Sequence, residues 1–197
     1  MKRALFILGV TVLCWAANAG EREVRLERPW GTLSGTLTRP DEAGDAVALL
    51  IAGSGPTDRD GNNPIGGRND ALKKLAWRLA QSNIASVRFD KRGIAQSQPA
   101  GPHESKLSLD QYVTDAVAWG EKLKSDPRFG KVFVLGHSEG ALIASLAAPR
   151  KVLMMVNAGA PVDDVIAKIA PLPTFEKSAL PRNRSNSMSA LSLTESA

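Results

Sequence analysis

The stretch that decides the fold is Val132-Phe133-Val134-Leu135-Gly136-His137-Ser138-Glu139-Gly140-Ala141-Leu142-Ile143-Ala144. Its first four residues predict a buried strand and its last residues a helix, with Gly-x-Ser-x-Gly between them. So sharp a change from strand to helix puts Ser138 in strained backbone geometry, and Gly136 and Gly140 remove the Cβ atoms that would collide. The pattern predicts a nucleophile elbow, which presents Ser138 at the C-terminal edge of a sheet.

A second glycine-rich turn, Gly53-Ser54-Gly55-Pro56, follows the unbroken apolar run 46–51. Such a run is typical of a strand buried on both faces of a parallel sheet. Acyl transfer needs two backbone N–H groups aimed at the oxyanion of the tetrahedral intermediate. The positions favour the amides of Glu139 and Ser54 as this oxyanion hole, with Gly55 as the near alternative to Ser54. An ordinary strand-exit turn is the other interpretation.

Strands and helices alternate along the rest of the chain. The alternating pattern over 23–38, interrupted by Pro29-Trp30-Gly31, predicts an antiparallel hairpin. Helices are expected over 70–80, 108–123 and 141–147, the first two capped by Asp70 and Ser108. Strands are expected over 46–51, 84–89, 132–135 and 152–156. This order predicts an α/β fold with a mostly parallel sheet and an N-terminal antiparallel hairpin.

The first nineteen residues have the features of a secretory signal peptide. Lys2-Arg3 form a charged start, residues 4–13 an apolar core, and Ala17-Asn18-Ala19 a small-residue cleavage site. An N-terminal membrane anchor is the alternative, but the apolar stretch is short for a bilayer. Cleavage would remove Cys14, the only cysteine, and leave no disulfide. We therefore expect a periplasmic or secreted protein without a stable membrane anchor.

Composition narrows the function classes. The formal net charge is +5, and no basic cluster is interleaved with aromatic residues, so nucleic-acid binding is not expected. The loop 58–62 does not have the spacing of a calcium site, and an Asx turn carrying an Asp–Arg pair is the better prediction. No metal and no cofactor are expected. A carbohydrate- or protein-binding module would need exposed aromatics, whereas Trp30, Trp77 and Trp119 stand at core-like positions. The oligomeric state is not encoded in these patterns.

Three motifs together resemble the α/β-hydrolase superfamily, in its exported bacterial esterase and serine-aminopeptidase-like branch. They are the segment 50–62, the strand and turn Arg88-Phe89-Asp90-Lys91-Arg92-Gly93, and the elbow 136–140. The chain departs from the family at Ala95, where the turn usually carries a second glycine. The resemblance implies a serine hydrolase with Ser138 as nucleophile, acting on a small-molecule ester or peptide, most readily a carboxylic ester.

The resemblance also implies an acid and then a histidine after the nucleophile. Of the two histidines, His137 belongs to the elbow and is expected to point away from Ser138. His103 precedes the serine, in the loop 99–106, and is a candidate base, although a solvated loop histidine is the favoured interpretation. Asp163 is a candidate acid, although a helix start is the favoured explanation. We therefore predict a hydrolase domain over 20–165 whose C-terminal strands are missing, and a low-order, serine-rich tail over 166–197. The alternative to an active enzyme is a catalytically inactive, truncated or frameshifted relative without the acid and the histidine.

Overall fold

A computed structural model describes residues 20–42, 44–147, 151–153 and 193–194. They build a seven-stranded sheet in the order β1-β2-β4-β3-β5-β6-β7. The strands are β1 (Gly20–Arg28), β2 (Gly31–Arg39), β3 (Ala46–Ile51), β4 (Ala85–Phe89), β5 (Lys131–Gly136), β6 (Lys151–Leu153) and β7 (Leu193–Thr194). Strands β4, β3, β5 and β6 are parallel, and the β1–β2 hairpin joins β4 through antiparallel pairing of β2. The predicted α/β class, the mostly parallel sheet and the N-terminal hairpin are confirmed.

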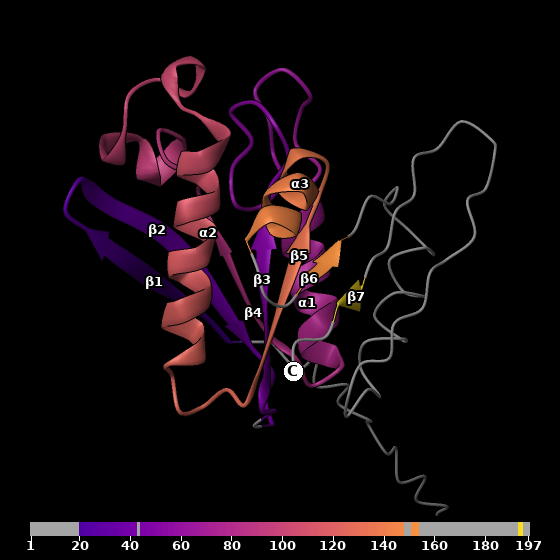
Figure 1. Cartoon of the computed structure of the whole chain (residues 1–197). Helices are drawn as coiled ribbons and strands as arrows, with labels where there is room; N and C mark the ends of the chain where they lie inside the picture. The colour runs from indigo at the N-terminus through magenta and orange to yellow at the C-terminus, as the bar shows by residue number, and fades with distance from the viewer. Residues whose placement is uncertain (1–19, 43, 148–150, 154–192, 195–197) are drawn as a thin grey trace, which may run out of the picture.

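Helices cover both faces of this sheet (Figure 1). They are α1 (Ala71–Gln81), α2 (Leu109–Lys124) and α3 (Glu139–Leu146), with short 3₁₀ helices η1 (Ala95–Ala100) and η2 (Glu104–Lys106) before α2. On β3, Leu49 packs in the cluster that includes α2 and α3, while Leu50 packs in the cluster with α1. Both faces of the strand are therefore buried, which explains why the run 46–51 has no polar alternation.

The two predicted helix caps differ in outcome. Ser108 occupies the N-cap of α2, where its N–H donates to Gln111 Oε1 at 2.9 Å, so this prediction is confirmed. Asp70 precedes α1 in the left-handed region (φ 51°), and its side chain makes no cap hydrogen bond. Instead, the Asp60 carbonyl accepts from the Leu72 N–H at 3.1 Å. Asp70 therefore stands at the predicted N-cap position, but the carbonyl of the preceding loop, and not the Asp70 side chain, accepts the hydrogen bond.

Two further regions refine the sequence-based picture. Trp119 is fully buried, but Trp77 is 43% exposed and donates its indole N–H to Glu21 Oε1 at 3.0 Å, so its core-like spacing was misleading. Leu193–Thr194, inside the predicted serine-rich tail, pair with β6 as a short antiparallel strand. The remainder of that tail and residues 154–156 of the predicted last strand lie outside the described residues. No helix within the described ranges has the length and apolarity needed to cross a membrane.

Candidate active site

Backbone strain and two obligatory glycines shape the elbow between β5 and α3. Ser138 has φ 54° and ψ −119°, a conformation that non-glycine residues rarely adopt. A Cβ atom on Gly136 would lie 2.0 Å from the Gly140 carbonyl oxygen. One on Gly140 would lie 2.3 Å from the Ile51 carbonyl oxygen. Only glycine fits at either position, as the Gly-x-Ser-x-Gly pattern predicts, and Ser138 is left exposed at the start of α3.

The loop that follows β3 lies directly beside the elbow. The His137 N–H donates to the Ile51 carbonyl at 3.1 Å and ties the elbow to the end of β3. A Cβ atom on Gly53 would lie 3.4 Å from Ser138 Cβ and 3.1 Å from His137 Nδ1. A Cβ atom at residue 53 would thus be tightly packed against His137 and in van der Waals contact with Ser138, which shows how closely the loop approaches the serine. The fold thus brings together two segments that are 85 positions apart in the sequence.

The amides of the predicted oxyanion hole carry no internal hydrogen bond. In the part of the chain that the structure describes, no acceptor contacts the N–H of Ser54 or of Glu139, and the same holds for Gly55. Glu139 is the first residue of α3, where a helix leaves its N–H groups without partners. Backbone N–H groups at such a position are suited to binding a developing negative charge.

The end of β4 and the turn that follows it contain four buried charged residues. We call this segment, Arg88–Arg92, the charged turn. Its four charged residues are between 0% and 7% exposed, and all four are paired with charged residues of other segments. Arg88 Nε bonds Asp60 at 2.6 Å, and Asp90 Oδ2 accepts from Arg59 Nη2 at 2.7 Å, so both hold the loop after β3. The motif was recognised in the sequence, but these partners were not, since they lie far away along the chain.

The remaining pairs of the charged turn reach the helices. Lys91 Nζ bonds Glu139 Oε1 at 2.8 Å, and Arg92 pairs with Asp115 of α2, its Nε lying 3.0 Å from Asp115 Oδ2. Burial raises the pKa of Asp115, and the hydrogen bonds from Arg92 oppose that rise.

The loop after β3 is held by its own polar side chains as well. Asp58 Oδ1 accepts from the N–H groups of Asp60 and Asn62 at 2.9 and 2.8 Å, which confirms the predicted Asx turn. The Asp–Arg pair predicted inside this loop is instead the pair of Arg59 with Asp90, because Arg59 turns toward the end of β4. No group of three or more potential metal-ligating His, Cys, Asp or Glu side chains occurs among the described residues.

The candidate base His103 makes its hydrogen bonds away from the serine. His103 is exposed, and its Nδ1 lies 3.1 Å from Ser105 Oγ, two residues further along the same loop. No hydrogen-bond partner of the Ser138 hydroxyl is found in the described ranges. Asp163 lies outside the described residues, so its predicted role as the acid stays a prediction.

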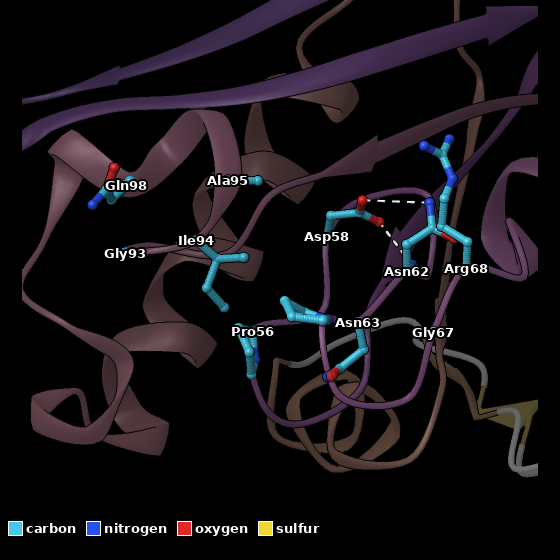
Figure 2. A pocket seen from close by; sticks show the side chains of 11 residues that line it. Pro56, Asp58, Asn62, Asn63, Gly67, Arg68, Gly93, Ile94, Ala95 and Gln98 are labelled. Carbon is cyan, nitrogen blue, oxygen red and sulfur yellow. Dashed lines mark hydrogen bonds between the residues drawn. The ribbon is translucent and has the colours of Figure 1, made fainter.

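A pocket of about 580 Å³ lies beside these loops at the same end of the molecule. Figure 2 shows it between the loop after β3, with Pro56, Asp58 and Asn63, and the segment after the charged turn, with Ile94 and Gln98. Ser138 is not among its lining residues. The hollow is therefore next to the candidate site and not centred on the serine.

Comparisons with solved structures define the class of the protein. The α/β-hydrolase GrgF from Penicillium sp. sh18 superposes with a TM-score of 0.50 and 20% identity, over 65% of this chain and 41% of that one. XC6422 from Xanthomonas campestris, described as an a/b serine hydrolase without lid, gives 0.50 and 23%, over 65% and 55%. At these identities the likeness shows the fold alone, and that fold is the α/β-hydrolase fold.

Sequence comparison then gives the family. The family model described as serine aminopeptidase, S33, matches residues 66–176, more than half of the chain, so the protein belongs to this family. Esterase EstD from Thermotoga maritima is 29% identical over 140 residues. That alignment covers 68% of this chain and 32% of EstD, so the chain spans about a third of the length of this curated relative. The predicted superfamily, with its serine-aminopeptidase-like branch, is confirmed.

Proposed function

We propose that the chain is a serine hydrolase that cleaves carboxylic esters with Ser138 as the nucleophile. One observation carries the proposal. Ser138 has a strained backbone conformation, and the backbone of Gly53 lies directly beside it. The amides of Glu139 and Ser54, or of Gly55 in place of Ser54, then form the oxyanion hole. Removing one such donor from a serine hydrolase typically costs roughly 2.7–4 kcal/mol of transition-state stabilisation.

The chemistry follows from these positions. Ser138 Oγ attacks the ester carbonyl carbon, and the carbonyl oxygen becomes an oxyanion that accepts from the two amides. The intermediate collapses by breaking the bond to the alkoxy group, which leaves as the alcohol after taking a proton. Water then attacks the acyl-enzyme and releases the carboxylic acid. A base must take the proton of Ser138, and Asp163 with a histidine is the arrangement that the family order suggests.

The competing proposal is a catalytically inactive relative that lacks the acid and the histidine. It is supported by the position of His103, whose hydrogen bonds are to Ser105 and not to Ser138. In this case the elbow and the loop after β3 would keep their architecture without an activated serine.

The proposal extends to the substrate and the location. An ester is favoured over a peptide because the relative EstD is called an esterase, although the family description names an aminopeptidase. Export to the periplasm or the medium is proposed from the charged start, the apolar core and the small-residue cleavage site within residues 1–19.

A fluorophosphonate probe tests the proposal without a guess at the substrate, because it reacts only with an activated serine. The folded chain should be labelled stoichiometrically, and Ser138→Ala and a heat-denatured sample should not. Labelling that persists in Ser138→Ala would place the nucleophile elsewhere. A folded chain that stays unlabelled would decide for the inactive relative.

A further inference from the structure

Lys91 is the most deeply buried charge at the candidate site. The residue is 0% exposed, and its ammonium donates to the Gly53 carbonyl and to Glu139 Oε1, each at 2.8 Å. The same Nζ lies 4.9 Å from the centre of the Tyr112 ring, a cation–π distance. A buried ammonium is costly unless its donors are satisfied, so this arrangement fixes the lysine and both of its acceptors.

Both acceptors belong to the proposed oxyanion hole. The Gly53 carbonyl is part of the peptide unit whose N–H is that of Ser54. In a planar trans peptide the C=O and N–H point in opposite directions, so a hydrogen bond from Lys91 on one side aims the Ser54 N–H to the other. The second acceptor is the side chain of Glu139, whose own backbone N–H is the other proposed donor.

We propose that Lys91 is a positioning residue that holds the two oxyanion donors at a fixed separation and orientation. The inference rests on the proposed function for its catalytic meaning. The ammonium links the loop after β3 to the first turn of α3, and its hydrogen bond to Gly53 polarises the peptide that carries the Ser54 N–H. Lys91 does not touch the reacting atoms, so it acts through these amides.

The neighbouring Arg92 offers a matched control. It is also a buried cation of the charged turn, but it pairs with Asp115 of α2, and its guanidinium lies 3.4 Å from the centre of the Trp30 ring. Removing the buried charge of Arg92 should lower the stability of the protein and leave the contacts of Lys91 with Gly53 and Glu139 unchanged. A general effect of destabilisation is thus separable from an effect on the two amides.

The test compares wild type, Lys91→Met and Arg92→Met in two measurements. Residual dipolar couplings report the direction of the Ser54, Gly55 and Glu139 N–H vectors, and they need no activity. The fluorophosphonate rate at saturating probe reports the oxyanion hole, and the labelled fraction reports folding. Lys91→Met should fold, because the Glu139 side chain is 28% exposed and water can solvate it. If it does not fold, Lys91→Gln replaces it in both assays.

We expect Lys91→Met to reorient the Ser54 or Gly55 N–H. Labelling should slow by roughly 10- to 100-fold, with unchanged probe affinity and full stoichiometry. This loss is smaller than the roughly 10²–10³-fold cost of removing one donor completely. Arg92→Met should change neither vector nor rate. Unchanged couplings in the folded Lys91 variant would overturn the inference. If the wild type is not labelled, the proposed function fails, and the couplings alone then decide whether Lys91 orients the two amides.

Discussion

The elbow and the charged turn both follow parallel strands of the same sheet, yet they are built in opposite ways. The elbow depends on side chains that are absent, since Cβ atoms on Gly136 and Gly140 would overlap backbone atoms. The charged turn depends on side chains that are present, with Arg88, Asp90 and Lys91 buried and bonded to the loop after β3. The elbow shapes one segment of the site, and the charged turn holds the neighbouring segment against it.

This difference predicts how each region tolerates change. A Cβ atom added in the elbow would collide with backbone atoms. No second substitution can remove backbone atoms, so none can restore the stability that the first one costs. An ion pair has two members, and exchanging both removes the unpaired charge that makes a single exchange costly. Changes at Gly140 and at the Arg59–Asp90 pair test this distinction most directly, and smaller effects are expected elsewhere.

The largest loss is expected from Gly140→Ala. Its Cβ would lie 2.3 and 2.6 Å from the carbonyl oxygens of Ile51 and Ala52, which are backbone atoms that cannot move aside cheaply. We expect a loss of more than about 4 kcal/mol in the free energy of unfolding, measured by urea denaturation. Gly120→Ala is the control, because that Cβ would meet nothing within 4 Å in the middle of α2. It should stabilise the protein by about 1 kcal/mol, and similar losses in both variants would contradict the steric argument.

Asp90→Asn should cost about 3 kcal/mol, because it leaves the buried Arg59 guanidinium without its counter-charge. The double variant Arg59→Met/Asp90→Asn should lose at least about 1 kcal/mol less than the sum of the single losses. Chemical denaturation of the four proteins gives this coupling. Additive losses would mean that the pair is not an energetic unit, and the contrast with the elbow would then be lost.

Ser138→Gly should raise the free energy of unfolding by about 1 kcal/mol and abolish fluorophosphonate labelling. The reason is that φ 54° and ψ −119° are strained for serine and open to glycine. Ser138→Ala serves as the control, since it removes the hydroxyl and keeps the strain, and it should stay close to wild type in stability. Equal stability of the glycine and alanine variants would show that the elbow is not strained.

A smaller gain, about 0.5–1 kcal/mol, is expected for Ala95→Gly. Ala95 has φ 44°, in the left-handed region, at the position where the family turn usually carries glycine. The matched exchange Ala118→Gly in the interior of α2 should instead destabilise by about 1 kcal/mol. Thermal unfolding of both variants suffices, and destabilisation by Ala95→Gly would show that Ala95 is well accommodated.

The smallest effect concerns a surface pair outside both regions. Arg128 hydrogen-bonds Asp126 and lowers the pKa of its carboxyl from 3.8 to about 2. Because the folded state ionises this group more readily than the unfolded state, its stabilising contribution is complete above about pH 4 and is lost as the pH falls through 2. Asp126→Asn should flatten the pH dependence of stability in that window by less than about 1 kcal/mol, since exposed ion pairs contribute little. An unchanged profile would assign the acid sensitivity to other carboxyls.

Sequence patterns were sufficient where the physics is local. The glycines flanking Ser138, the apolar run of β3 and the Gln111 that follows Ser108 each lie within a few residues of the feature they specify. The succession of strands and helices along the chain and the elbow could therefore be predicted. Such patterns could not decide whether His103 lies near Ser138, because this depends on the path of the whole loop; in the structure His103 is exposed and its hydrogen bonds are to Ser105.

By itself, the sequence determined the α/β fold, the hairpin and the turn that exposes Ser138, because hydrophobic periodicity and glycine spacing act over short distances. Only the tertiary structure decided that Arg59 pairs with Asp90, that the loop carbonyl of Asp60 caps α1, and that Lys91 joins Gly53 to Glu139. A buried charge takes its partner from whichever segment the sheet order brings alongside it, and the partners of Lys91 lie 38 and 48 positions away in the chain.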